Sequence, residues 1–128
     1  MTDIHFSVAA VDCPDPLALA QFYADLTGLE VEPLGDFLPE NVTWIELLNN
    51  GKPTLGFQKI ESYAPPTWPE GNQPQRLHFD FAVRDLDEGQ ARALALGATL
   101  ADVQPGTTFR VFLDPIDHPF CLVLDIND

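Results

Sequence analysis

Basic residues are scarce in this sequence. Its 128 residues include six lysines and arginines against twenty aspartates and glutamates, which gives a net charge of −14. So few cations cannot meet a run of nucleic-acid phosphates, and the same charge disfavours anionic membrane surfaces. We therefore expect neither nucleic acid nor membrane among the partners. The charge itself is typical of a protein that stays dispersed by self-repulsion.

Cysteines are few and long apolar runs are missing. The two cysteines, Cys13 and Cys121, form no CxxC pair, which argues against a disulfide framework and a structural zinc site. No apolar run approaches the roughly 18–20 residues of a membrane-spanning helix. The first residues carry an early acid and no basic region, unlike a signal peptide, so we expect a cytoplasmic protein.

An internal repeat organises what is present. Segments 8–31 and 78–101 each pass from an apolar run through an acidic turn into a helical pattern that ends at a glycine. Such a repeat indicates two copies of one structural unit. The first helical pattern places apolar residues at i, i+3, i+4 and i+7, which gives it one buried side: Leu19, Phe22, Tyr23 and Leu26.

The ends of both helices carry recognisable signals. Asp15 predicts the start of the first helix, and either Asp85 or Asp87 predicts the start of the second, because a carboxylate can accept a hydrogen bond from a free backbone N–H. Gly28 and Gly97 are expected to end them.

Three strands are predicted after each helix, which makes the pattern βαβββ twice. They cover 29–34, 42–49 and 53–60, and then 98–104, 108–115 and 119–126. Asn50-Gly51 predicts a tight hairpin turn. We predict an α+β fold in a single domain, 1–128, with modules at about 4–60 and 77–126 joined by a Pro-rich linker, 61–76. The helices should cover one face of a curved mixed sheet and leave the other face as a cleft.

Three motifs resemble a known superfamily. "DPLALAQFYADLTGLEV", "HFDFAVRDLDE" and "DPIDHPFCLV" are similar to the vicinal oxygen chelate superfamily, the group of glyoxalase I, extradiol dioxygenases and the bleomycin and fosfomycin resistance proteins. Within that group the chain is most similar to glyoxalase-like domain proteins of unassigned activity. The resemblance spans about 4–126 and implies the fold predicted above. It also implies a homodimer, since related chains often pair.

The resemblance implies a metal site with one ligand on the first and last strand of each module. The corresponding positions are Val8, Gln58, His78 and Cys121. Val8 has no donor and an amide is a weak one, which leaves His78 and Cys121, whereas zinc or iron sites usually need three good protein ligands. We therefore predict no metal and no cofactor, with a bound divalent metal as the alternative.

Strand alternation points to a polar pair on the open face. His78 and Asp80 fall on one side of their strand, and the apolar residues around them fall on the other. The pair could act as a general base, or Asp80 could merely orient His78. By the same alternation Cys121 faces the cleft, where it could be reactive or simply a small buried residue.

Aromatic side chains and one cation complete the predicted ligand site. Trp44 and Trp68 are expected to line a mostly apolar pocket. Arg110 and Phe112 share a side of their strand, and Arg110 could anchor an anionic group or form a surface ion pair. The predicted ligand-binding residues are His78, Gln58, Cys121, Trp44, Trp68, Arg110 and Phe112.

These observations leave three functional hypotheses. The first is a protein that binds an aromatic or amphipathic small molecule without catalysis or with an unassigned activity. The second is a metal-dependent lyase, isomerase or dioxygenase of the glyoxalase type. The third is a metal-free enzyme that uses His78 with Asp80, so whether the chain is an enzyme stays open at this point.

Overall fold

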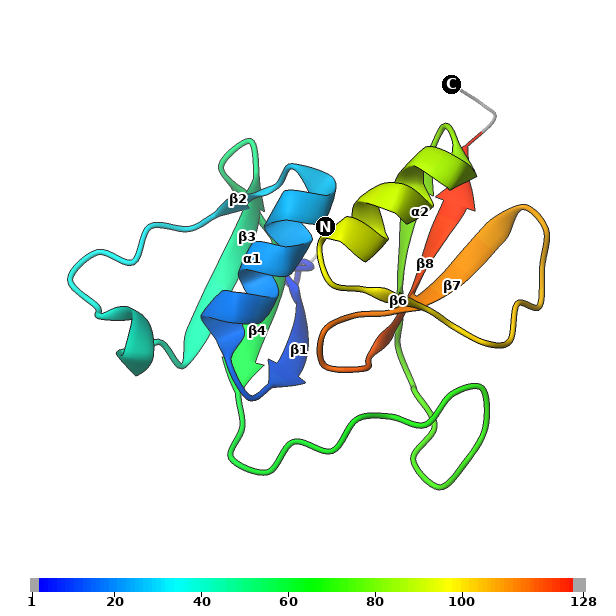
Figure 1. Cartoon of the computed structure of the whole chain (residues 1–128). Coiled ribbons are helices and arrows are strands. Elements are labelled where there is room, and N and C mark those ends of the chain that lie inside the picture. The colour runs from blue at the N-terminus through cyan, green and yellow to red at the C-terminus, as the bar shows by residue number, and fades with distance from the viewer. Residues whose placement is uncertain (1–2, 126–128) are drawn as a thin grey trace. The chain divides into compact units, whose positions relative to one another are not determined.

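The computed structural model describes residues 3–125 and divides the chain into two compact units, Met1–Tyr63 and Ala64–Asp128. Each unit contains one α-helix and one four-stranded mixed sheet, so the predicted α+β fold of two βαβββ modules is confirmed. Figure 1 shows the chain order of these elements. Within residues 3–125, neither helix has the length and apolar character required to cross a membrane.

The first unit builds its sheet in the order β1-β4-β3-β2. Strand β1 runs parallel to β4, and the other neighbours are antiparallel. Its elements are β1 (Ala9–Cys13), α1 (Pro16–Thr27), β2 (Glu30–Val31), the short 3-10 helix η1 (Pro39–Asn41), β3 (Trp44–Asn49) and β4 (Lys52–Lys59). The tight turn between β3 and β4 has Asn50 at φ 51° and Gly51 at φ 82°, which confirms the predicted hairpin.

Helix α1 begins and ends where the sequence indicates. The Asp15 carboxylate accepts a hydrogen bond from the Ala18 N–H at 3.2 Å, and Gly28 closes the helix in the left-handed region at φ 84°. The buried side of the helix lies on the sheet, where the Tyr23 ring stacks on Phe57 with 5.9 Å between centroids. This contact fixes the helix over the face that carries the odd-numbered residues of β4.

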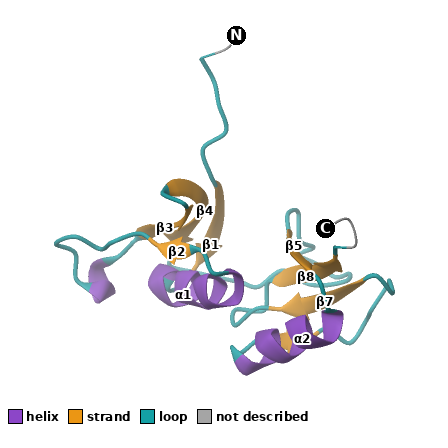
Figure 2. Ribbon diagram, turned by 90° about the horizontal axis from the view of Figure 1, so that it is seen from above, coloured by secondary structure: helices purple, strands orange, loops and turns teal. Residues whose placement is uncertain are grey.

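The second unit repeats this topology. Its elements are β5 (Phe79–Val83), α2 (Leu86–Ala95), β6 (Thr99–Leu100), β7 (Phe109–Leu113) and β8 (Pro119–Leu124). The sheet order is β5-β8-β7-β6, again with the first pair parallel. Asp85, and not Asp87, caps α2, because its carboxylate accepts the Glu88 N–H at 3.0 Å. Figure 2 shows each helix against one face of its own sheet.

The strands that follow the two helices are shorter than predicted, at two residues each. In both units a side chain takes over the pairing where the edge strand stops. A carboxylate oxygen of Glu32 accepts the Glu46 N–H at 2.9 Å, and the Gln104 amide oxygen accepts the Val111 N–H at 2.9 Å. Sequence patterns cannot distinguish this side-chain pairing from a continued strand, because both keep the backbone extended.

Candidate functional site

The open face of the second sheet, turned away from α2, carries the cluster His78, Asp80 and Cys121. His78 directly precedes β5, and Asp80 is the register partner of Cys121 across the parallel pair of β5 and β8. One ligand atom from each side chain lies within 4.8 Å of the other two. The sequence predicted that His78 and Asp80 share a side, and the structure adds the thiol to the same cluster.

The three groups of the cluster interact with one another. The distance from His78 Nε2 to Asp80 Oδ1 is 3.2 Å, and both side chains are largely exposed. Burial raises the pKa of the Cys121 thiol to about 11, and the charge and hydrogen bond of Asp80 act in the same direction. The thiol is therefore protonated at neutral pH and is a poor nucleophile in this environment.

An apolar patch adjoins this polar cluster on the same face. Its buried members are Ala101, Val111 and Cys121, and Trp68, Phe109 and Val123 pack against them. Trp68, predicted as a rim residue of the linker, therefore packs against this patch of the second unit. Sequence reasoning missed Val111 and Val123, although their alternation in β7 and β8 was a usable signal.

The structure corrects the predicted role of Phe112 and shows the ion pair that was one of the two roles expected for Arg110. Phe112 is fully buried and stacks on Phe120 with 5.5 Å between ring centroids, so it belongs to the core and not to a ligand site. The Arg110 guanidinium donates to Asp87 and to Gln90 on α2, both at 2.9 Å. The two residues do share a side of β7, but that side faces the helix, because Val111 and Phe109 occupy the open face.

A second imidazole lies near the cluster. His118 is half-buried in the turn between β7 and β8, where the buried Asp114 carboxylate accepts a hydrogen bond from the His118 backbone N–H at 3.0 Å. Burial lowers the pKa of His118, with a smaller contribution from His78, and Asp114 opposes the change. His118 is therefore neutral at physiological pH and can serve as a hydrogen-bond partner without adding charge.

In the first unit, the predicted site residues Trp44 and Gln58 are register partners on the open face of β3 and β4. The Trp44 indole donates from Nε1 to a Glu46 carboxylate oxygen at 3.1 Å. Its ring lies over Gly56, where an added Cβ would come within 2.6 Å of the ring. The indole is therefore held flat on the sheet by one hydrogen bond and by the missing side chain beneath it.

Register identifies the true counterparts of the cluster in the first unit. Ala10 pairs with Gly56 as Asp80 pairs with Cys121, so Gly56 and not Gln58 is the equivalent of Cys121. His78 corresponds to Val8 by the same count. The alignment of Gln58 with Cys121 is corrected here, and the equivalent positions of the first unit offer no donor set.

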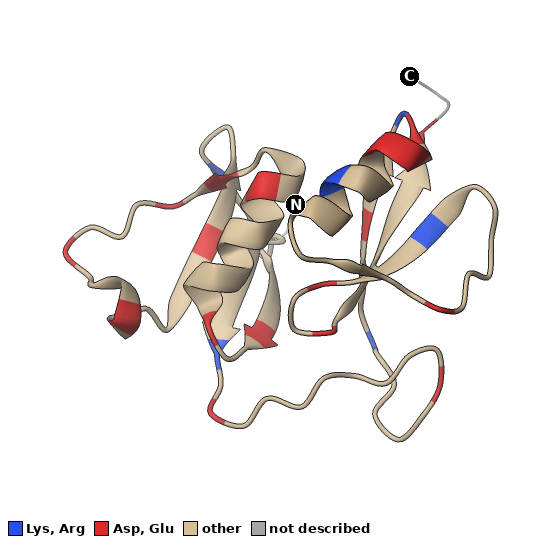
Figure 3. Cartoon of the chain, viewed as in Figure 1, with Lys and Arg blue, Asp and Glu red and all other residues tan. Residues whose placement is uncertain are grey.

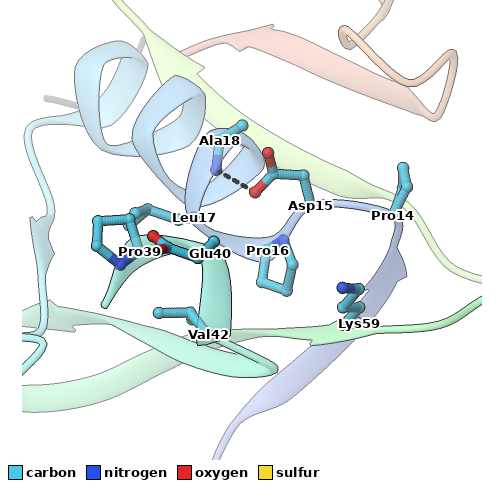
Figure 4. Close-up of a pocket in the computed structure, with 9 residues that line it drawn as sticks. All are labelled: Pro14, Asp15, Pro16, Leu17, Ala18, Pro39, Glu40, Val42 and Lys59. Atoms are coloured by element: carbon cyan, nitrogen blue, oxygen red, sulfur yellow. Dashed lines mark hydrogen bonds between the residues drawn. The ribbon is translucent and has the colours of Figure 1, made fainter. Parts of the chain in front are cut away.

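Two cavities lie within the first unit. One, of about 480 Å3, adjoins the start of α1. Figure 4 shows Asp15 directed at the Ala18 amide there, with Lys59 and Glu40 also lining the space. The other cavity measures about 320 Å3 and lies beside Trp44.

The sequence pattern of the glyoxalase-like domain family matches residues 8–123. The chain therefore belongs to that family, which confirms its resemblance to the vicinal oxygen chelate superfamily. No curated protein matches the chain by sequence.

Solved structures show the same fold. A glyoxalase/bleomycin resistance protein/dioxygenase family enzyme from Burkholderia phytofirmans has 20% identity and a TM-score of 0.65, with 92% of this chain and 96% of that chain covered. A mutant of the genomically encoded fosfomycin resistance protein of Listeria monocytogenes, complexed with Mn(II) and a dihydroxypropylphosphonic acid, has 18% identity and a TM-score of 0.69. That match covers 99% of this chain and 95% of the other. At these identities the likeness concerns the fold alone.

Proposed function

We propose that this chain binds a small amphipathic or aromatic molecule on the open face of its second sheet. The observation that carries the proposal is the contact of a polar cluster, His78–Asp80–Cys121, with the apolar patch formed around Val111 and Trp68. Ligand sites combine an apolar surface with a few placed polar groups in this way. The exposed imidazole and carboxylate would orient the ligand, and the patch would bury its apolar part.

A fragment titration tests this binding function. Phenol and benzoate are titrated into the 15N-labelled protein, and we expect amide shifts at Cys121 and Val111 together with a shift of the Trp68 indole N–H. His78→Ala should weaken binding by about threefold to tenfold, the cost of losing one hydrogen bond to a charged or polar group. His5→Ala is the matched control, because His5 is an exposed histidine of the first unit. Binding that is unchanged in His78→Ala would refute the assignment.

A metal-dependent activity of the glyoxalase type is the second candidate, and the three-donor cluster favours it. Imidazole nitrogen, carboxylate oxygen and thiolate sulfur are ligand types of zinc sites, so His78, Asp80 and Cys121 fit such an ion. A metal there would supply Lewis acidity toward a bound oxygen. Sequence reasoning counted two strong donors, and Asp80 is the third.

Elemental analysis after metal repletion tests this alternative. If the cluster holds zinc or manganese, we expect about one equivalent per chain, lost in Cys121→Ser and retained in Cys13→Ser. Cys13 is the matched control because it is also buried but donates to the Gln58 backbone carbonyl instead of lying beside a carboxylate. Cobalt substitution should add a thiolate charge-transfer band that disappears only in Cys121→Ser. A wild-type protein that retains no metal would remove this candidate.

The His78–Asp80 pair also supports metal-free general-base catalysis, which stays a prediction with a clear signature. Such activity would show a bell-shaped pH–rate profile, and Asp80→Asn would abolish it.

A homodimer is also part of the proposal. It rests on the family resemblance and on the edge strands of the two sheets, which pairing with a second chain could cover. These edges are β1 and β2 in the first sheet and β5 and β6 in the second. Sedimentation equilibrium should give twice the mass of the chain. A monomer mass at concentrations near 100 µM, about the range in which weak pairs dissociate, would contradict it.

A further inference from the structure

The cavity beside Trp44 combines an aromatic wall with a single charge. It lies in the first unit between the segment that leads to η1 and the start of β3, and its apolar walls include Leu34, Phe37 and Trp44. Within the described chain, Glu32 is the one charged residue that lines it. At about 320 Å3 the cavity has the volume of a small organic ligand.

The two groups that a cation would meet are both fixed in place. Trp44 is held by its hydrogen bond to Glu46 and by the packing of its ring over Gly56, and the residue stays 39% exposed. Glu32 is held by the Glu46 N–H at 2.9 Å. A carboxylate accepts several hydrogen bonds, so Glu32 retains capacity for a ligand.

The charge of the surrounding unit has the same sign as Glu32. Residues 1–63 contain ten aspartates and glutamates and two lysines. Figure 3 shows acidic residues on β3, on α1 and along the loop that leads to η1. Such a distribution raises the local concentration of cations and disfavours anions. An indole face adds attraction for an ammonium group through its quadrupole.

We propose that this cavity binds a small organic cation, an ammonium group carried on an apolar or aromatic body. The ammonium lies against Glu32 and the Trp44 ring, and the body lies among the apolar walls. The site is confined to the first unit and does not depend on what binds at His78, so it goes beyond the function proposed above.

Three probes of similar size and different charge test the proposal. They are phenethylamine, 2-phenylethanol and 3-phenylpropanoate, titrated at neutral pH into a Trp68→Phe background so that fluorescence reports Trp44 alone. We expect phenethylamine to bind at least about threefold to fivefold more tightly than 2-phenylethanol, the advantage of a partly exposed ion pair with a cation–π contact. We expect no binding of 3-phenylpropanoate. The preference should weaken as salt is raised.

Charge variants locate the attraction. Glu32→Gln keeps the acceptor for the Glu46 N–H and should remove the preference for phenethylamine. Glu30→Gln is the matched control, because it removes the same charge from β2 outside the cavity and should leave the preference intact. Thr43→Lys, which adds a cation to the lining, should abolish phenethylamine binding while 2-phenylethanol still binds.

Two results would overturn the proposal. Equal affinity for phenethylamine and 2-phenylethanol would mean that the cavity binds only the apolar part of these probes and does not recognise the ammonium group. An equal loss in Glu32→Gln and Glu30→Gln would assign the attraction to the overall charge of the chain. Since His78 is not among the residues that line this cavity, failure here and failure of the proposed binding function are separate outcomes.

Discussion

The two units share a scaffold and differ in the chemistry of their open faces. Asp15 and Asp85 cap equivalent helices, and β1 pairs with β4 in the same register as β5 with β8. Where the second unit has Asp80 and Cys121, however, the first has Ala10 and Gly56. The helix-covered face must fill a core and is mostly apolar, with Arg110 paired to Asp87 at its margin, whereas the open face is free to acquire donors.

The open faces also differ in the groups that surround their carboxylates. In the first unit Asp12 lies on β1 beside Gln58, and Glu46 on β3 accepts a hydrogen bond from the Trp44 indole. In the second unit the position equivalent to Glu46 is the apolar Val111, and the carboxylate is Asp80 on β5. One scaffold thus carries an acid beside an aromatic face and, separately, an acid between an imidazole and a thiol. These arrangements suit different ligands.

The largest expected effect on stability distinguishes the helix-covered face of the second sheet, which packs as in the first unit, from the open face, where the two units differ. Phe112→Ala should lower the free energy of unfolding by about 3–5 kcal/mol, because it leaves a cavity beside Phe120 in a core that packs under α2. Phe109→Ala, on the open face of the same strand, should cost less than half as much, since its ring is only partly buried. Urea unfolding monitored by far-UV circular dichroism measures both. Equal losses would mean that the open face of the second unit is as tightly packed as its core.

Local signals in the sequence were sufficient for the helices, the hairpin and the repeat. A capping carboxylate, a left-handed glycine and an Asn-Gly turn each act over a few residues, so Asp15, Gly28 and Asn50 determine their own surroundings. The family could be identified for the same reason, because its motifs coincide with these local features. The polar pair of His78 and Asp80 also followed from the two-residue period of one strand.

Facts that depend on pairing between distant strands could not be predicted. Alternation shows that Arg110 and Phe112 share a side of β7, but only the position of α2 decides which side that is. The equivalence of Gly56 and Cys121 depends on the register of two parallel strand pairs, β1 with β4 and β5 with β8. The alignment of motifs in the sequence placed Gln58, two residues further along, at the position of Cys121. Asp80 lies beside the Cys121 thiol because the register of β5 and β8 pairs the two residues. The sequence alone did not give this pairing, so it predicted two strong metal donors where the structure has three.

Titration of Cys121 gives an intermediate effect in the second unit. Its pKa is raised from an ordinary 9.0 to about 11, so the folded state favours the neutral thiol. That stabilisation is fully present below about pH 9 and is lost as the pH rises toward 11, by at most about 2–3 kcal/mol. Urea unfolding with EDTA and a reductant should therefore show the stability of wild type falling relative to Cys121→Ala over this range. Parallel curves for the two proteins would contradict the burial of the thiol beside Asp80.

The smallest expected effect tests how the first unit holds Trp44. In Gly56→Ala the new methyl would come within 2.6 Å of the indole, and the ring, being partly exposed, can swing away. We expect a loss of about 1 kcal/mol in unfolding free energy, at the low end for overpacking, because the side chain can move. The Trp44 indole N–H resonance should shift as its hydrogen bond to Glu46 is lost, and its fluorescence should move to the red. Gly51→Ala on the adjacent turn is a control for the loss of a glycine, because its added methyl meets open space. The substitution strains a left-handed backbone at φ 82°, but it should leave the indole resonance in place. If Gly56→Ala also leaves that resonance unchanged, Trp44 does not rest on Gly56, and the aromatic face of the first unit is oriented by Glu46 alone.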